Sequence, residues 1–586
     1  MTGDASGAIA EPSLGMVLMP LHRRFLFRIM YKILIDDVET TVPAGTTVLE
    51  AARTLGIDIP TLCFHDGGFH KGAEEPACAP TTCQVCLVGI DGRVVPACAT
   101  RVENGMRIES ETDGIKRLRR AALELLLSDH AGDCFAPCQF GCPARLDIPG
   151  MMRAIRAGDH AEALRIVHET IPIPAILGRI CPAPCEKLCR RKDIDAPVAI
   201  CRLKGFIGET ALRTARDGAV KRDGAVERDG AVERARKDGP LVPEIDGESR
   251  TTGKRVAIVG AGATGLTAAH YLARFGFRVE LFEQADGAGG RLREQTGDRL
   301  PESLLDAEIE TILGQPGITF RPNTPVRWGN ADVLREIRER FDAVLLAGGS
   351  CDVNALKQSG LDCGEKGLLV GPGTYTTSRN GIFAAGTLLR PNALPNARSN
   401  VLVVRSVADG REAAESIHSH LVDNRIHPVE PLWSVRMKKL DKTELNAFVE
   451  TAPDRGMRPR CEPKNAAGGY TADGYTADEA SEQASRCLHC DCPGQSDCRL
   501  LHYGRAYRAN PSGESVAGKT AERPRMRLLH GQGILFEPSK CIKCGLCVRI
   551  TQQRREPIGL TLIGRGFGVE IGVPFGRSLN EGLGRS

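Results

Sequence analysis

Cysteine is the residue that most constrains this chain. Of its 22 cysteines, all but Cys351, Cys363 and Cys461 fall in three groups, at 63–98, 134–201 and 487–547. A disulfide framework is typical of short secreted chains, whereas this chain has 586 residues and no convincing signal peptide at its start. The grouped thiols therefore predict metal ligands in a reducing, cytoplasmic setting.

Length and composition limit the remaining possibilities. The length predicts several domains, and 77 basic against 73 acidic residues give no reason to expect a nucleic-acid partner. No apolar run approaches the 18 residues that would predict a membrane span. Composition shifts and the repeats DGAVKR, DGAVER and DGAVER suggest these segments: a disordered leader 1–30, domains at 31–112 and 113–210, a charged linker 211–253, a domain at 254–420, a connector 421–479 and a C-terminal segment 480–586.

The first cysteine group follows a strand pattern. Residues 32–48 alternate like two strands joined by a turn at Pro43-Ala44-Gly45, and LEAARTLGI then predicts a short helix leading to Cys63. Four thiolates can hold a two-iron cluster or a structural zinc ion, and the strands before them favour a ferredoxin.

The motifs IPTLC, CQVC and PACAT resemble the N-terminal [2Fe–2S] domain of the large iron–sulfur subunit of respiratory NADH dehydrogenase and its hydrogenase and formate dehydrogenase relatives. The resemblance implies a β-grasp ferredoxin domain with Cys63, Cys83, Cys86 and Cys98 as ligands. Cys78 is an alternative to Cys63, because Cys78-x4-Cys83-x2-Cys86 also matches the plant-type ferredoxin spacing.

The second group follows a predicted helix at about 114–129, with apolar residues Ile115, Leu118, Ala122, Leu125 and Leu126. The group contains seven cysteines, one fewer than two four-iron clusters need. The stretches GCPARLDIPGMM and GRICPAPCEKLCRR resemble the helical iron–sulfur domain of the glutamate synthase small subunit and of dihydropyrimidine dehydrogenase.

That resemblance implies two [4Fe–4S] clusters whose ligands come crosswise from both halves of the segment. One cluster would use Cys134, Cys138 and Cys189, and the other would use Cys142, Cys181, Cys185 and Cys201. His130 is a candidate for the missing eighth ligand, although a histidine at a helix end is also a common partner of the helix dipole.

A dinucleotide fingerprint follows the linker. The strand RVAIVG leads into Gly260, Gly262 and Gly265 before a helix, and a second strand ends at Glu283. These glycines permit a tight turn, close approach of a pyrophosphate and close helix packing, while the acidic residue accepts from a ribose hydroxyl.

Later motifs favour FAD over NAD in this Rossmann-like domain. Gly290 and Arg291, DAVLLAGG, NGIFAAG and SVADGREAAESI resemble the FAD domain of disulfide-reductase-like enzymes in order. Thr387, after Gly386, stands where that family has an aspartate. Only about 30 residues separate DAVLLAGG from NGIFAAG, too few for the NADPH domain that glutamate-synthase-like proteins insert there.

The third group contains seven further cysteines: Cys487, Cys490, Cys492, Cys498, Cys541, Cys544 and Cys547. The last three resemble a cluster-binding segment of the same dehydrogenase and hydrogenase subunits, with Thr551 where a fourth cysteine would stand. A three-iron cluster, a cluster completed by Cys492 or Cys498, and a zinc site all remain open, so one or two further clusters are possible here.

Together these features predict a multidomain α/β and α+β oxidoreductase subunit that transfers electrons between FAD and iron–sulfur clusters. Without its own nicotinamide domain, it would depend on a partner redox subunit of the NADH dehydrogenase, hydrogenase or formate dehydrogenase type. Two alternatives are a self-sufficient NAD(P)H oxidoreductase of the glutamate synthase small-subunit type and a zinc-stabilised FAD-binding scaffold.

Overall fold

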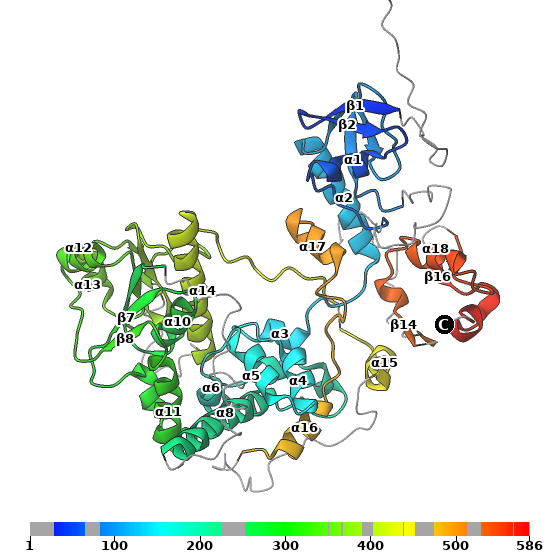
Figure 1. Ribbon diagram of the computed structural model, residues 1–586. Helices are drawn as coiled ribbons and strands as arrows, with labels where there is room; N and C mark the ends of the chain where they lie inside the picture. Colours follow the sequence, from blue (N-terminus) through cyan, green and yellow to red (C-terminus); the bar gives the residue numbers. More distant parts are fainter. Residues whose placement is uncertain are drawn as a thin grey trace, which may run out of the picture. The chain divides into compact units, whose positions relative to one another are not determined.

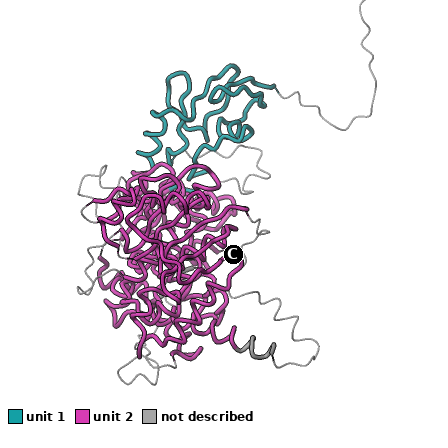
Figure 2. Tube along the Cα trace, turned by 90° about the vertical axis from the view of Figure 1, so that its left-hand side faces the viewer, with its two compact units in different colours: residues 1–123, 544–546 teal, residues 124–543, 547–586 magenta. Residues whose placement is uncertain are grey.

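The computed structural model describes residues 29–64, 82–223, 252–349, 351–364, 367–389, 402–437, 439–451, 474–511, 529–531, 533–565 and 568–584 (Figure 1). Two compact units make up the chain: residues 1–123 with 544–546, and residues 124–543 with 547–586 (Figure 2). Residues 1–28 of the expected leader, Cys78, Cys461 and most of the repeat linker lie outside the described residues.

The first unit contains a five-stranded mixed sheet in the order β2-β1-β5-β3-β4, in which β1 and β5 are parallel and the other pairs antiparallel. Its strands are β1 (Met30–Ile35), β2 (Val38–Pro43), β3 (Leu87–Ile90), β4 (Arg93–Pro96) and β5 (Arg107–Glu109). Helix α1 (Val48–Thr54) shares a buried core with the sheet. A capping box between Thr47 and Glu50 fixes the start of this helix.

The hairpin turn lies elsewhere than predicted. Strands β1 and β2 are joined at Asp36 and Asp37, whose φ angles are 46° and 66°, and the Pro43-Ala44-Gly45 turn instead leads from β2 toward α1. A tight two-residue hairpin favours left-handed backbone at both turn residues. Aspartate tolerates this conformation better than most other residues. The Asp36 carboxylate also accepts a hydrogen bond from the Ser110 backbone N–H at 2.6 Å.

The helix predicted at 114–129 is present as α2 (Asp113–Asp129), but its inward face differs from the apolar pattern. Leu118 and Leu125 are 44% and 50% exposed, whereas Arg119 is fully buried. The Arg119 Nε donates to the Leu87 carbonyl at 2.9 Å. A buried arginine that satisfies a backbone carbonyl therefore occupies a position that hydrophobicity alone would assign to solvent.

The second unit contains a five-stranded parallel sheet in the order β12-β9-β6-β7-β8. Its strands are β6 (Arg255–Val259), β7 (Arg278–Phe282), β8 (Ile318–Arg321), β9 (Ala343–Leu346) and β12 (Ile382–Ala384), and its helices are α10 (Ala263–Arg274), α11 (Glu302–Leu313), α12 (Ala331–Arg340), α13 (Val353–Gln358) and α14 (Val403–Asp423). The order strand, glycine-rich turn, helix matches the prediction for residues 255–283.

A helical segment precedes this sheet in the chain. It comprises α3 (Pro137–Gly141), α4 (Ile148–Arg156), α5 (His160–His168), α6 (Pro174–Ile180), α7 (Pro184–Lys187), η1 (Arg190–Asp193) and α8 (Ile200–Asp223). Its buried side chains and those around the parallel sheet form one continuous core. Helix α8 runs to Asp223, past the boundary predicted at residue 210.

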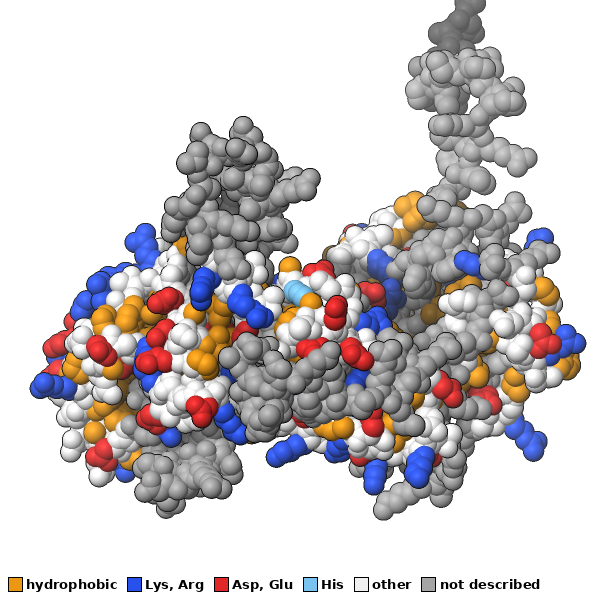
Figure 3. All heavy atoms as spheres, turned by 90° about the horizontal axis from the view of Figure 1, so that it is seen from below, with side chains coloured by type: hydrophobic (Ala, Val, Ile, Leu, Met, Phe, Trp, Pro, Cys, Tyr) orange, Lys and Arg blue, Asp and Glu red, His pale blue; other side chains and the backbone are white. Residues whose placement is uncertain are grey.

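The C-terminal part consists of short elements. These are α15 (Lys442–Thr451), α16 (Ala477–Ser485), α17 (Arg499–Ala506), β13 (Leu529–Gly531), β14 (Ile534–Phe536), η4 (Pro538–Lys540), α18 (Leu546–Gln553), β15 (Thr561–Ile563), β16 (Glu570–Gly572), η6 (Pro574–Gly576) and α19 (Leu579–Gly582). Among the described helices, none is long and apolar enough to cross a membrane. On the face drawn in Figure 3, basic and acidic side chains are interspersed.

Candidate cofactor sites

The first unit brings four predicted ligands together. Cys63, Cys83, Cys86 and Cys98 are all buried. Cys86 precedes β3 and Cys98 follows β4, and the Ala97 N–H donates to the Cys86 carbonyl at 3.0 Å, which holds the two loops side by side.

The sulfur atoms of this set are in mutual contact. Hydrogen bonding with Cys83 and Cys98 lowers the pKa of the Cys63 thiol, and hydrogen bonding with Cys98 lowers that of Cys86. The same contacts raise the pKa of Cys83 and Cys98. Four buried thiols that share hydrogen bonds are a suitable ligand set for a small metal cluster.

A second set lies in the helical segment of the other unit. Cys142, Cys181, Cys185 and Cys201 line one cavity. They come from the ends or first turns of α3, α6, α7 and α8, so four helix termini converge there. Val404, in the first turn of α14, lines the same cavity. The set therefore lies against the parallel-sheet domain.

A buried lysine also lines that cavity. Lys204 is 4% exposed, and its Nζ lies 3.8 Å from the Cys201 sulfur, one turn earlier on α8. Burial opposes its charge, but the surrounding thiols, Cys201 first among them, raise the pKa of Lys204 above its ordinary value. A buried basic side chain therefore lies beside this set.

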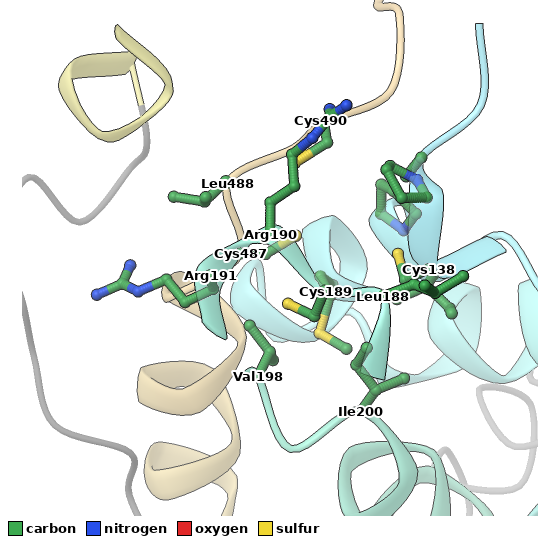
Figure 4. Close-up of a pocket in the computed structure, with 15 residues that line it drawn as sticks. Cys138, Leu188, Cys189, Arg190, Arg191, Val198, Ile200, Cys487, Leu488 and Cys490 are labelled. Atoms are coloured by element: carbon green, nitrogen blue, oxygen red, sulfur yellow. The ribbon is translucent and has the colours of Figure 1, made fainter. Parts of the chain in front are cut away.

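A third set joins distant parts of the second unit. Cys138 and Cys189 line a second cavity together with Cys487 and Cys490, from the segment after α16 (Figure 4). Burial raises the pKa of Cys138 strongly, and the thiols of Cys189, Cys487 and Cys490 raise it further.

Three charged side chains hold the segment after α16 against η1. Arg191 and Arg486 are buried, and each guanidinium donates to the Asp195 carboxylate, at 2.9 Å and 3.0 Å. Arg191 also donates to the Arg486 backbone carbonyl at 3.0 Å. These charge-assisted bonds position the Cys487-x2-Cys490 pair.

Arg190 is the cation nearest the third set. Its guanidinium contacts the Cys490 thiol and is also ion-paired with the nearly buried Asp133 carboxylate. The positive charge beside this set is therefore already balanced by a carboxylate.

Cys134 groups differently from the expected partition, which placed it with Cys138 and Cys189. The Cys492 N–H donates to the Cys134 carbonyl at 3.2 Å, and the thiols of Cys492 and Cys498, after burial, raise the pKa of Cys134. His130 has its Nδ1 2.9 Å from the Lys540 carbonyl oxygen, and burial lowers its pKa. The imidazole thus has a backbone partner.

The last cysteines lie around η4 and α18. Cys541 directly follows η4, and Cys547 lies in the first turn of α18. The Thr551 hydroxyl, at the position of a missing fourth cysteine, donates to the Val548 carbonyl at 2.9 Å and accepts from the Leu560 N–H at 3.0 Å. The ligand partners of Cys541, Cys544 and Cys547 stay a prediction.

Within the described residues, no group of three or more His, Cys, Asp or Glu side chains has the spacing that holds a single metal ion. Thiolates around an iron–sulfur cluster bind several iron atoms rather than one, so they lie farther apart than the ligands of a lone ion.

The glycine-rich turn after β6 has the geometry of a pyrophosphate cradle. Gly260 has a φ of 104°, and a Cβ there would lie 2.6 Å from the Ala347 carbonyl oxygen. A Cβ at Gly265 would lie 1.9 Å from the Gly260 carbonyl oxygen, whereas one at Gly262 would meet nothing within 4 Å. Two glycines thus allow close packing and the third faces open space, as the dinucleotide fingerprint requires.

The other predicted residues surround this turn. Glu283 is buried, and its carboxylate accepts from the Ala261 N–H at 2.8 Å. Gly290, with a φ of 49°, lies against Gly262, while Arg291 is exposed and ion-paired with Glu294 at 3.5 Å.

Two further predicted residues lie in η3 (Gly386–Leu389). A Cβ at Gly386 would lie 2.4 Å from the Thr264 hydroxyl oxygen, so the glycine permits close approach to α10. Thr387 follows it and is partly buried.

One polar network was not predicted. The Tyr375 hydroxyl donates to Glu412 at 2.5 Å, and Arg405 donates to Asp409 at 2.8 Å and to Glu412 at 3.0 Å. Asp409 and Glu412 lie on α14, which the motif SVADGREAAESI predicted as a helix. The two acidic residues on the buried face of this helix were the sequence signal that could have predicted the network.

The segment between β9 and β12 is short. Its described residues contain α13 and the two-stranded pair β10 (Cys363–Gly364) and β11 (Gly367–Leu368). Those described residues contain no βαβ unit of the kind that binds a second dinucleotide.

Comparisons with known proteins match three parts of the chain. Residues 30–113 match a 2Fe-2S iron–sulfur cluster binding domain, residues 128–216 match dihydropyrimidine dehydrogenase domain II with its 4Fe-4S cluster, and residues 211–400 match a pyridine nucleotide-disulphide oxidoreductase domain.

Curated relatives match about 40% of the chain. The NADP(+)-dependent formate dehydrogenase subunit beta of Moorella thermoacetica is 36% identical over 237 residues, covering 40% of this chain and 32% of the relative. The NADPH-Fe(3+) oxidoreductase subunit beta of Geobacter sulfurreducens is 35% identical over 239 residues, covering 40% and 31%.

The glutamate synthase (NADPH) small chain of Mycobacterium tuberculosis is 33% identical over 221 residues, covering 37% of this chain and 39% of the relative. The chain therefore matches only about a third of the length of these relatives. The predicted resemblances are confirmed: residues 30–113 are a 2Fe-2S cluster binding domain, residues 128–216 a 4Fe-4S domain of the dihydropyrimidine dehydrogenase type, and residues 211–400 a pyridine nucleotide-disulphide oxidoreductase domain.

Proposed function

We propose that the chain is an electron-transfer subunit of an oxidoreductase, which holds FAD, a [2Fe–2S] cluster and two [4Fe–4S] clusters. FAD when bound exchanges electrons in pairs and iron–sulfur clusters exchange them singly, so together they connect two-electron donors to one-electron acceptors. The observation that supports the proposal is the four-cysteine cavity against α14, because a cluster held there would lie beside the FAD-type domain.

The proposed ligand sets group thiols that contact one another or share a cavity. In the first unit, a β-grasp ferredoxin domain would use Cys63, Cys83, Cys86 and Cys98. One [4Fe–4S] cluster would use Cys142, Cys181, Cys185 and Cys201. The other would use Cys138, Cys189, Cys487 and Cys490, so that the C-terminal segment supplies two ligands, one in place of Cys134 and one in place of His130.

The flavin site would be built around the turn after β6. The open space at Gly262 suits a pyrophosphate, and the helix α10 that begins there favours its negative charge. Glu283, Gly290 and Arg291, with Gly386 and Thr387, would surround the rest of the cofactor.

Cofactor analysis tests the proposal directly. The protein purified without oxygen should be brown and carry one FAD and at least about 10 iron atoms per chain, the sum for one two-iron and two four-iron clusters. A colourless protein that carries zinc instead would support the alternative of a zinc-stabilised FAD-binding scaffold.

Single substitutions test the ligand partition. Cys189→Ser and Cys487→Ser should remove the same [4Fe–4S] signal from the electron paramagnetic resonance spectrum, and Cys185→Ser should remove the other. Cys363→Ser is the matched control, since Cys363 lies in β10, outside every group. Retention of both signals in Cys487→Ser would contradict the proposed partition.

A second candidate is direct reduction by NADPH, favoured by the name of the Geobacter relative, an NADPH-Fe(3+) oxidoreductase subunit. The short segment between β9 and β12 favours a partner subunit as the source of electrons instead. Anaerobic titration decides between them: NADPH and NADH alone should leave the flavin absorbance unchanged, while dithionite bleaches it. Bleaching by NADPH alone would establish the self-sufficient enzyme.

A further inference from the structure

Lys204 is a buried cation in an unusual position. It lies on α8, three residues after Cys201, so both side chains point from the same face of the helix. Its one hydrogen bond is to the Cys201 sulfur, and no carboxylate of the described residues forms an ion pair with it.

A buried charge needs a partner of opposite sign. An ammonium removed from water without one is strongly destabilising, and proteins keep such groups only where a counter-charge is close. Among the described residues, the four thiols that share its cavity are placed to supply that charge, which they would do as thiolates around a metal cluster.

The other four-cysteine set in this unit has a different electrostatic environment. Arg190 contacts Cys490, but the Asp133 carboxylate is ion-paired with the same guanidinium. Arg191 and Arg486 share the Asp195 carboxylate. Each cation near that set therefore has a carboxylate partner, whereas Lys204 has none among the described residues.

We propose that the Lys204 ammonium raises the reduction potential of the cluster held by Cys142, Cys181, Cys185 and Cys201 above that of the cluster held by Cys138, Cys189, Cys487 and Cys490. Reduction adds a negative charge to a cluster, and an uncompensated cation in contact with one of its sulfurs stabilises that charge in a medium of low dielectric constant. The inference rests on the proposed function, since it requires both clusters.

The consequence is an order of reduction. The cysteine set beside α14 of the FAD-type domain would hold the cluster that is reduced at the higher potential. Lys204 acts on the cluster through its contact with the Cys201 sulfur.

Two substitutions separate charge from hydrogen bonding. Lys204→Met keeps the length of the side chain and removes its charge, and Lys204→Gln keeps an N–H donor without the charge. In a redox titration of the purified full-length protein followed by electron paramagnetic resonance, both should lower the potential of one cluster by about 59 mV, which is a tenfold change in a one-electron equilibrium. The reduction potential of the other cluster, whose signal is lost in Cys487→Ser, should not change.

Lys187→Met is the matched control. Lys187 lies in α7 between Cys185 and Cys189, but it is exposed, so water screens its charge and neither potential should change. Unchanged potentials in Lys204→Met, equal shifts of both clusters, or a wild-type potential in Lys204→Gln would overturn the proposal.

The cluster-free chain gives an independent measurement. After removal of iron, Lys204 lacks its counter-charge, so Lys204→Met should raise the urea midpoint of the iron-free protein. An unchanged or lower midpoint would overturn the proposal even where the variant fails to assemble clusters. A wild-type protein without iron would refute the proposed function itself, whereas assembled clusters with unshifted potentials would refute the role of Lys204 alone.

Discussion

At the scale of single residues, the three glycines of the turn after β6 divide into two kinds. Gly262→Val should abolish FAD binding and leave the iron-free, flavin-free fold intact, because its Cβ meets no protein atom within 4 Å and would enter the space proposed for the pyrophosphate. Gly265→Ala should instead destabilise the fold, since its Cβ would overlap the Gly260 carbonyl oxygen at 1.9 Å. Flavin content and thermal unfolding of both variants check this difference; an FAD-replete Gly262→Val would contradict it.

The roles of Gly260 and Gly265 were predictable from the sequence, because the dinucleotide motif requires glycine where the backbone turns or packs closely. The sequence did not predict the role of Arg119, because a charged residue on a predicted helix is ordinarily placed in solvent. Its burial depends on the Leu87 carbonyl, which a strand far away in the sequence provides.

At the scale of elements, a carboxylate from another helix accepts hydrogen bonds from the first backbone N–H groups of α6. Glu308 of α11 accepts from the Ala175 and Ile176 N–H groups, both at 2.7 Å. Burial raises the pKa of Glu308 from 4.5 to about 8, against the effect of these bonds. The folded protein therefore keeps a proton that the unfolded chain releases, so this contribution to stability is full below pH 4.5 and is lost as the pH rises through about 8.

Glu308→Gln should flatten that dependence. The wild-type free energy of unfolding should lose up to about 1.4 kcal/mol per pH unit from this residue between pH 5 and 8, and the variant should not. Unfolding midpoints across that range measure the effect, with Glu310→Gln, exposed on the same helix, as the control. A slope that is the same in all three proteins would show that Glu308 is ionised in the folded state.

Several elements were predictable because local periodicity determines them. The buried run at 255–260 and the helix at 114–129 are examples. The prediction of the hairpin turn at Pro43-Ala44-Gly45 was wrong. Proline and glycine are strong turn residues and drew the prediction there, but the hairpin turn is formed by Asp36 and Asp37. The prediction of a linker from residue 211 did not consider that charged residues such as lysine, arginine and glutamate also favour helix. Helix α8 continues to Asp223.

At the scale of the whole molecule, the grouping of thiols from distant segments could not be predicted. Spacing identifies ligands that are neighbours in the sequence, but Cys189 and Cys487 share a cavity although nearly 300 residues separate them. What brings them together is the ionic contact of Asp195 with Arg191 and Arg486, whose partners no local pattern indicates.

This long-range connection has a measurable consequence. If a cluster joins residues 138 and 189 to residues 487 and 490, removing iron with a chelator should release the end of α16 from η1 while the parallel sheet keeps its own core. Hydrogen exchange should then increase at least about tenfold in residues 477–490 and 189–195, since local opening no longer has to break metal–thiolate bonds. Residues 255–259 and 343–346 of the sheet serve as the internal control and should stay protected. Equal protection of residues 477–490 with and without iron would show that Asp195 and the two arginines hold this segment by themselves.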